Sequence, residues 1–215
     1  MEHAPRPPQP TTSRETENFS LEKSVAKAKG VIAAHNLPLE SFIDLYGPAT
    51  IAADVNTIQR MEKIFADKNT EENKDARFNQ LATCFEGFFI DQVDRGMLGE
   101  QTKSLKTSRY DDIINGVDSV TEITRPSQTT QHLGLALDAT YSSQALEGKF
   151  YKIIGKLANN EMTSVKYFQS ENTGFRGEYK MPLFVAGISP ENLASLLSVW
   201  TSGNEQPRGR APRYL

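Results

Sequence analysis

The chain has few of the residues that build covalent links or metal sites. Its 215 residues include one cysteine, Cys84, and three singly scattered histidines. One thiol excludes an internal disulfide and any zinc site built from several cysteines. Such sparing use of cysteine is typical of a cytoplasmic protein, and we expect that compartment.

Long hydrophobic runs are also missing. No apolar stretch approaches the roughly 20 residues that a membrane-spanning helix needs. Four prolines lie within the first ten residues, where a signal peptide would have its apolar core. The sequence therefore predicts no membrane segment and no secretory leader.

The charge balance is mildly acidic. Lys plus Arg is 24 and Asp plus Glu is 27, a net charge of −3. This argues against a protein whose whole surface binds nucleic acid, but it leaves a local basic groove open. Lys103, Lys106 and Arg109 form one basic cluster, which is either such a groove or a solvated face.

Four parts can be distinguished along the chain. We expect a disordered arm at 1–17, which is rich in proline, and a disordered tail at 202–215. Between them, apolar spacing predicts a helical N-terminal region at 18–73 and an α/β domain at 74–201. The helical region has no catalytic spacing, which favours a docking or oligomerisation role and leaves open a homodimer formed through these helices.

The α/β domain shows alternating helix and strand patterns. A helix should end at Gly96, followed by a loop at 97–111. Strands are predicted at 117–123, 132–140, 164–169 and 183–189, with helices at 143–160 and 190–200. In the helix at 143–160, an apolar stripe that includes Phe150, Ile154 and Leu157 should face inward. The order predicts a sheet flanked by helices rather than a βαβ repeat.

Two acidic residues lie near the ends of the first two predicted strands. The strand at 132–140 has apolar side chains on one face and mostly small side chains on the other, which predicts that both faces are buried. Asp138 then needs a hydrogen-bond partner, a cation or a role as a cap. If this strand pairs as a hairpin with 117–123, Asp118 and Asp138 converge at one edge of the sheet. Converging carboxylates repel unless a cation neutralises them, and oxygen ligands without His or Cys suit Mg²⁺ or Mn²⁺.

A third carboxylate comes from the preceding helix. Glu86 falls inside the apolar arc of its helical wheel, between Val93 and Ile90. A glutamate turned toward the core needs a partner, unless it reaches outward at the boundary of the stripe.

Together these residues resemble the PD-(D/E)XK nuclease superfamily, which has the restriction-endonuclease-like fold. In that family a helix with an acidic residue comes first, then a strand with a Gly-x-x-Asp-like motif. A hairpin strand with Asp/Glu-x-Lys follows, then a helix and further strands. Glu86 matches the helix acid, Gly116-Val-Asp118 the first motif, and Asp138-Ala-Thr140 the second. The resemblance covers residues 76–200 and implies a mixed sheet flanked by helices, preceded here by the helical N-terminal region.

One position departs from the family pattern. Thr140 stands where the family has the lysine that orients or activates the attacking water. Members of the superfamily move this lysine to the following helix, where Lys149 and Lys152 lie in this sequence. Lys149 lies closer to the apolar stripe than Lys152 does, so it is the first choice for the lysine that positions water.

The resemblance implies a Mg²⁺- or Mn²⁺-dependent nuclease. Asp118 and Asp138 would hold the metal, Glu86 would assist, and Lys149, Lys152 or Thr140 would position water. Nucleic acid, with DNA favoured over RNA, is the expected partner. Phosphates would contact four basic residues: Lys103, Lys106, Arg109 and Lys166.

Several alternatives remain open. The chain could be a catalytically inactive member that binds nucleic acid or protein, or an unrelated α/β protein whose carboxylates only cap turns. Asp111 and Asp112, just before the first motif, could bind metal through water or cap a short helix. The aromatic and basic residues around Lys166 could stack on bases or pack in the core.

Overall fold

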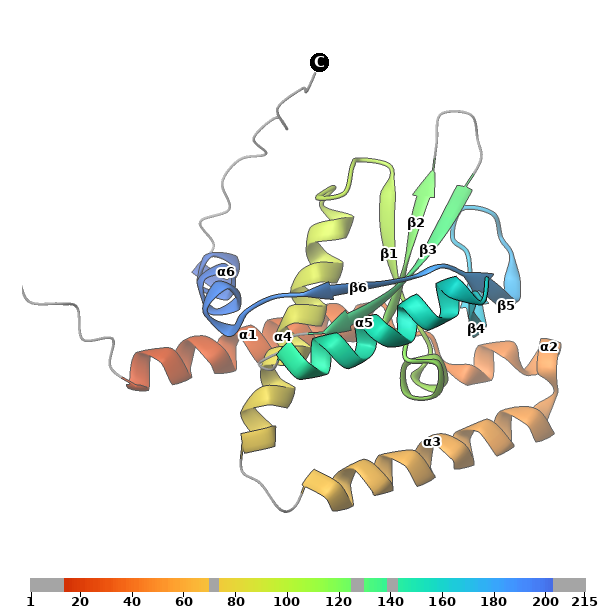
Figure 1. Cartoon of the computed structure of the whole chain (residues 1–215), viewed down its shortest axis with the longest axis horizontal. Helices are drawn as coiled ribbons and strands as arrows, with labels where there is room; N and C mark the ends of the chain where they lie inside the picture. The colour runs from red at the N-terminus through yellow and green to blue at the C-terminus, as the bar shows by residue number, and fades with distance from the viewer. Residues whose placement is uncertain (1–13, 70–73, 125–129, 139–142, 203–215) are drawn as a thin grey trace, which may run out of the picture.

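A computed structural model describes residues 14–69, 74–124, 130–138 and 143–202. Figure 1 shows a small sheet crossed by helices, a mixed α/β architecture. The helical elements are α1 (Arg14–Ala34), a 3-10 turn η1 (Leu39–Phe42), α2 (Ile43–Tyr46), α3 (Pro48–Asn69), α4 (Lys74–Asp94), a π-turn η2 (Asp111–Asn115), α5 (Ser143–Ala158) and α6 (Pro190–Ser202). The strands are β1 (Thr102–Lys106), β2 (Ser119–Thr124), β3 (Thr130–Asp138), β4 (Thr163–Gln169), β5 (Arg176–Met181) and β6 (Leu183–Gly187).

The main sheet has the strand order β1-β2-β3-β6. β1, β2 and β3 are antiparallel neighbours, and β6 runs parallel to β3. The hairpin predicted for the strands at 117–123 and 132–140 is confirmed: these strands are β2 and β3, and Ser119 lies opposite Leu135. β4 and β5 form a separate antiparallel pair.

The N-terminal helix α1 belongs to the core of the α/β part. Ala28 of α1 is fully buried and lies in one hydrophobic cluster with Phe85 of α4 and Trp200 of α6. In Figure 1 these three helices lie together on one side of the molecule. The helical region predicted as a separate part at 18–73 therefore shares its core with the predicted α/β domain.

The boundary of the predicted N-terminal arm needs correction. Helix α1 begins at Arg14, so the last residues of the arm expected at 1–17 are helical. The first residues of the arm and nearly all of the tail expected at 202–215 lie outside the described residues. The last proline of this stretch is Pro10, so residues 14–17 contain no proline that would interrupt a helix.

Two strands were not predicted. β1 lies inside the stretch expected to be a loop at 97–111, and β5 follows β4 after a turn. β1 escaped prediction because its buried positions are polar: Thr102, Ser104 and Lys106. A strand whose inward side chains are not hydrophobic lacks the alternation that identifies strands in a sequence.

The two faces of the sheet are covered differently. On one face Val120 of β2 packs with Val165, Phe168 and Met181 of the β4–β5 pair. On the other face α4 lies against β1, where Ser104 donates its backbone N–H to Asp94 over 2.9 Å. None of the described helices is long and apolar enough to cross a membrane.

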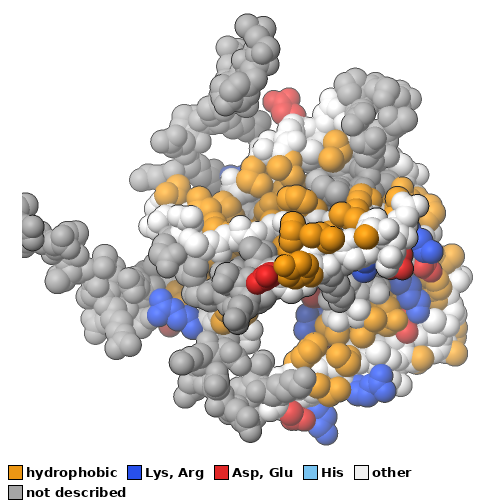
Figure 2. Space-filling model, in the orientation of Figure 1, with side chains coloured by type: hydrophobic (Ala, Val, Ile, Leu, Met, Phe, Trp, Pro, Cys, Tyr) orange, Lys and Arg blue, Asp and Glu red, His pale blue; other side chains and the backbone are white. Residues whose placement is uncertain are grey.

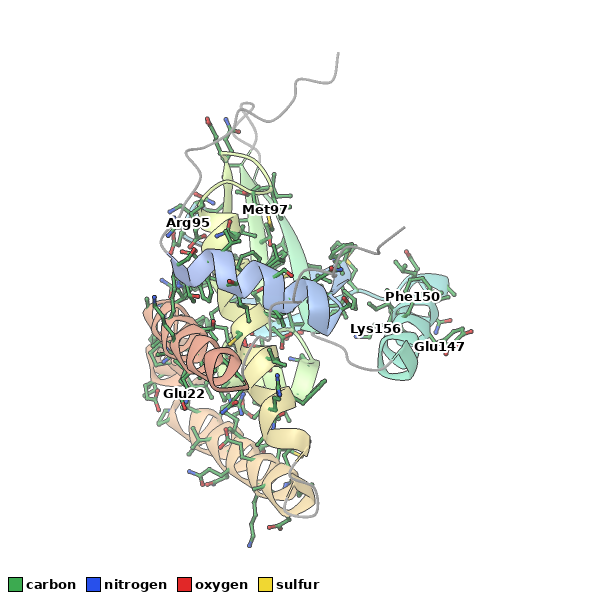
Figure 3. All side chains as sticks on the ribbon, turned by 90° about the vertical axis from the view of Figure 1, so that its left-hand side faces the viewer. Glu22, Arg95, Met97, Glu147, Phe150 and Lys156 are labelled. Atoms are coloured by element: carbon green, nitrogen blue, oxygen red, sulfur yellow. The ribbon has the colours of Figure 1, made fainter. Side chains whose placement is uncertain are left out.

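Helix α5 does not bury the stripe that its sequence predicted. Phe150, Ile154 and Leu157 were expected to face inward, but they are 58, 43 and 64% exposed. Figure 3 shows α5, with Phe150 labelled, on the opposite side of the strands from α1. The prediction of an inward stripe is wrong here because α5 contacts the sheet mainly at β6.

Candidate functional site

The two motif aspartates lie at the same end of the β2–β3 hairpin. Asp118 directly precedes β2, and Asp138 is the last residue of β3, where its backbone is opposite Gly187 of β6. Since Ser119 is opposite Leu135, the start of β2 and the end of β3 meet at one edge. The side chain of Asp138 lies outside the described residues, so the convergence of the two carboxylates stays a prediction.

The candidate water-positioning residues also lie outside the described part. Thr140 belongs to the segment 139–142, which the structure does not describe. Lys149 and Lys152 are on α5, as predicted, but their side chains are not described.

Glu86 is turned toward the interior, as its place in the apolar arc predicted. Its side chain is 19% exposed, and its Oε1 lies 2.8 Å from Nζ of Lys106. Burial raises the pKa of the Glu86 carboxyl above its usual value, while the charge of Lys106 opposes this shift. The partner that a buried glutamate requires is therefore a lysine from β1.

Lys106 is the buried centre of a partly buried polar group that we call the Lys106 cluster: Glu86, Lys106, Asp112 and Asp118. The lysine is only 9% exposed, and its Nζ also lies 3.3 Å from Oδ2 of Asp112 and donates to the carbonyl oxygen of Asp118 over 3.0 Å. Burial lowers the pKa of Lys106, but the charges of Asp112, Glu86 and Asp118 outweigh it and the net shift is upward. Lys106 is thus held as a cation among carboxylates.

Arg109 extends this cluster to the surface. The side chain is 54% exposed; its Nε donates to Glu62 of α3 over 2.9 Å and its Nη1 donates to Asp112 over 2.8 Å. Burial lowers the pKa of Arg109, but the hydrogen bond to Glu62 and the charge of Asp112 raise it overall. The two ion pairs of Arg109 connect α3 to the loop before β2.

Two of the four residues predicted to bind nucleic acid are at the surface. Lys103 is 57% exposed and donates to Glu171 over 2.9 Å, and Arg109 is similarly open. All four have intramolecular partners, but Lys106 and Lys166 are only 9% and 23% exposed. A phosphate would reach Lys103 and Arg109 without disturbing the buried part of the structure.

Lys166 lies in a cluster of three tyrosines. Its Nζ is 5.6, 5.0 and 5.3 Å from the ring centroids of Tyr46, Tyr110 and Tyr167. Both the lysine and the Tyr167 hydroxyl donate to Oδ2 of Asp54 on α3. Burial and this hydrogen bond raise the pKa of Tyr167. These aromatic side chains therefore serve core packing, which was one of the two alternatives open at the sequence level.

Asp111 is an internal anchor of the loop before β2. It is fully buried and accepts hydrogen bonds from Ser108 Oγ at 2.8 Å and from Asn115 Nδ2 at 2.6 Å. It also accepts the backbone N–H groups of Lys166 and Tyr167, at 2.7 and 2.9 Å. These bonds join the loop before β2 to β4. The cap considered for Asp111 is not observed, since the π-turn η2 has no side-chain cap hydrogen bond, and metal binding through water stays a prediction.

The described carboxylates do not form a metal site on their own. Among the residues with described side chains, no group of three or more His, Cys, Asp or Glu is placed to hold a metal ion. In the Lys106 cluster an ammonium group stands where a cation would otherwise neutralise the acids. Asp112 is the second carboxylate that pairs with Lys106. The only sign of this role in the sequence was the run of acidic residues after Arg109.

The chain matches no protein-family model, no curated protein and no solved structure. What the fold defines is a mixed α/β protein with an acidic and basic cluster at one end of its main sheet.

Proposed function

We propose that the chain is a Mg²⁺- or Mn²⁺-dependent nuclease with a restriction-endonuclease-like domain. The observation that carries the proposal is the order of elements. Helix α4 with Glu86 comes first, β2 follows Asp118, β3 pairs with β2 as a hairpin and ends at Asp138, and α5 and further strands come next. This order agrees with the one that the sequence resemblance implies for residues 76–200.

The relative positions of the acidic residues support the same proposal. Asp118 and Asp138 lie at one end of the hairpin. Glu86 reaches that end through Lys106, whose ammonium also contacts the Asp118 carbonyl. In this proposal the three acids, which come from three consecutive parts of the chain, meet at one edge of the sheet, where oxygen ligands suit Mg²⁺.

In this proposal each residue has a distinct role. Asp118 and Asp138 hold the cation, which polarises a phosphodiester and activates water, and Glu86 assists. Lys149, Lys152 or Thr140 orients the water, while exposed Lys103 and Arg109 hold phosphates. DNA is the preferred substrate over RNA, and the proposed compartment is the cytoplasm.

The first test is cleavage of plasmid, single-stranded DNA and RNA by the purified full-length chain in Mg²⁺ and in Mn²⁺. Asp118→Asn and Asp138→Asn should abolish cleavage while the variants remain folded. Glu100→Gln, at an exposed carboxylate near the far end of β1, is the matched control and should cleave as the unmutated chain does. Cleavage that persists in both aspartate variants would reject the proposed site.

The second test identifies the residue that orients water. Lys149→Ala should depress turnover by about 10²-fold with little change in substrate affinity, since the group acts mainly in the transition state. Lys152→Ala, on the same helix, is the comparison. A loss of affinity with unchanged turnover would instead mean that Lys149 only contacts phosphate.

A catalytically inactive module is the second candidate, and Lys106 is the observation that favours it. Its ammonium pairs with Glu86 and Asp112, and Arg109 also pairs with Asp112, so these two acids need no metal ion for charge balance. Such a protein would bind nucleic acid or protein without cutting. Binding without cleavage, unaffected by Asp138→Asn and by chelation of divalent cations, would establish this alternative.

A further inference from the structure

Three oxygen atoms from three parts of the chain surround the ammonium group of Lys106. Its Nζ lies 2.8 Å from Oε1 of Glu86 on α4 and 3.3 Å from Oδ2 of Asp112 in the π-turn. It also donates to the backbone carbonyl of Asp118, just before β2, over 3.0 Å. We call these three oxygens the Lys106 cage. Two carboxylates and one carbonyl thus meet at the position of a single positive charge.

The contact between Glu86 and Lys106 is an ion pair without the geometry of a hydrogen bond. Oε1 of Glu86 is closed off from solvent and has no hydrogen-bond partner, although Nζ is 2.8 Å away. A buried carboxylate oxygen without a hydrogen bond is costly unless an opposite charge lies beside it. Lys106 therefore acts on Glu86 as a compact point charge, which is also how a metal ion acts on its oxygen ligands.

The oxygens of the cage are held by contacts that do not involve Lys106. The π-turn is anchored by the buried Asp111, which accepts two backbone N–H groups of β4. The carbonyl of Asp118 also accepts the backbone N–H of Thr107 over 3.3 Å. Glu86 belongs to α4, a helix of the main core. We therefore expect the three oxygens to stay near one another when the ammonium group is removed.

We propose that the Lys106 cage is a divalent-cation site that the chain fills with its own lysine, and that Ca²⁺ binds there once the ammonium is removed. Carboxylate and carbonyl oxygens are the ligands of hard cations. Mg²⁺ needs a near-ideal octahedron at about 2.0–2.1 Å, whereas Ca²⁺ accepts irregular sets of oxygens at about 2.3–2.6 Å. From the ammonium distances of 2.8, 3.0 and 3.3 Å, the cage contracts less for Ca²⁺. Water supplies the remaining ligands.

In the unmutated chain Lys106 is then a tethered cation, so this part of the structure needs no metal ion. The side of the cage nearest to solvent is formed by Asp112 and Arg109, which are 20 and 54% exposed. Arg109 pairs with Glu62 of α3, and Figure 2 shows charged side chains of both signs along α3 at the bottom of the view. An entering cation therefore meets a surface of mixed charge.

The proposal does not depend on nuclease activity. The metal ion of the proposed nuclease is held by the carboxylates of Asp118 and Asp138, whereas the cage uses the backbone carbonyl of Asp118. Glu86 then assists the nuclease site through Lys106 and is not itself a ligand of the catalytic metal ion.

The test is the response of the full chain to Ca²⁺ after a chelator has removed other metal ions, measured by melting temperature and by calorimetric titration. Lys106→Met keeps the aliphatic part of the side chain but ends one atom short of the ammonium, so it leaves the Nζ position open. Ca²⁺ at about 100 times its dissociation constant should raise the melting temperature of this variant by about 5–10 °C more than that of the unmutated chain. The titration should find one more Ca²⁺ per chain in the variant. Lys106→Ala should respond in the same direction, and Ca²⁺ should restore folding to either variant that does not fold without it.

Lys103→Met is the matched control on the same strand, because Lys103 forms its ion pair with Glu171 at the surface. It should respond to Ca²⁺ as the unmutated chain does. Adding Glu86→Gln to Lys106→Met removes the charge of one ligand and should abolish binding of the additional ion. Equal responses of Lys106→Met and the unmutated chain would overturn the proposal, and so would an additional ion that persists with Glu86→Gln.

The same measurements separate this proposal from the proposed nuclease site. If the unmutated chain binds no divalent cation but Lys106→Met binds one, the cage is supported and the metal site of Asp118 and Asp138 is rejected. If both chains bind one ion, the cage is rejected and the nuclease site is retained. Absence of binding in both chains rejects both.

Discussion

Gly87 of α4 lies so close to Ala28 of α1 that a Cβ added at position 87 would come within 2.6 Å of the Ala28 Cα. The added carbon would also meet the Ala28 Cβ at 2.7 Å and its carbonyl oxygen at 3.0 Å. Because the nearest atoms belong to backbone, no side-chain rotation can relieve the contact. The close crossing of α1 and α4 thus depends on the missing side chain of Gly87.

Gly87→Ala should therefore destabilise the protein by about 2–3 kcal/mol, as overpacking does. This would occur although alanine is the better helix former by about 1 kcal/mol. Gly30→Ala in α1 is the control, since no atom lies within 4 Å of an added Cβ there, and it should leave the free energy of unfolding unchanged or raise it slightly. Urea denaturation of both variants measures the difference. Equal effects would show that α1 and α4 do not cross as closely as described.

Lys106→Met should lower the free energy of unfolding by about 3 kcal/mol, because it leaves the partly buried carboxylates of Glu86 and Asp112 without their buried cation. Lys103→Met is the matched control on the same strand, where an exposed ion pair with Glu171 contributes about 0–1 kcal/mol. If the proposed metal site forms, Mn²⁺ should raise the melting temperature of Lys106→Met more than that of the unmutated chain. Similar losses in the two methionine variants would contradict the buried position of Lys106.

Lys166→Met tests whether Lys166 is structural or binds phosphate. The lysine donates to Asp54 and lies among three tyrosine rings, so its loss should cost about 2 kcal/mol of stability. Lys180→Met, at an exposed position of β5, should change stability by less than about 0.5 kcal/mol. If Lys166 contacts phosphates instead, its loss would leave stability unchanged and reduce the salt slope of nucleic-acid binding by about one.

Cys84 should be unreactive in the folded protein. It is fully buried, and burial raises its pKa to about 11, so the thiolate is scarce near neutral pH. A thiol reagent at pH 8 should label it only at the rate at which the protein opens. Fast labelling without denaturant would contradict the packing of α4.

The same pKa shift predicts a pH dependence of stability. Above pH 9 the unfolded thiol loses its proton before the folded one does, so the native state binds more protons and stability falls as pH rises from about 9 to 11. The free energy of unfolding of the unmutated chain should fall relative to that of Cys84→Ala over this range. A difference that stays constant with pH would show that the thiol titrates alike in both states.

Much of the secondary structure could be predicted because it follows from short-range patterns. The helix with Glu86 inside its apolar arc, the hairpin of the two motif strands and the start of α6 at Pro190 all agree with the structure. Each depends on spacing or capping within a few residues. β1 could not be predicted in this way, because its inward residues become buried only through contact with α4.

The Lys106 cluster shows why a candidate site is harder to predict than its members. Glu86, Lys106 and Asp112 come from a helix, a strand and a turn, and all three were noted in the sequence. The sequence suggested Lys106 as a phosphate contact, but the structure buries it and pairs it with two partly buried carboxylates. The sequence does not distinguish a solvated lysine from a lysine in an ion pair, because the partners come from distant parts of the chain.

The sequence by itself determined the class of the protein: an α/β chain with one thiol, no long apolar helix and acids at the ends of a hairpin. These features follow from composition and local periodicity, which each segment carries alone. Only the tertiary structure decided that α1 joins the main core, that Lys106 neutralises Glu86 and Asp112, and that α5 leaves its apolar face exposed. Burial and ion pairing depend on which segments meet, and that is settled by packing over the whole chain.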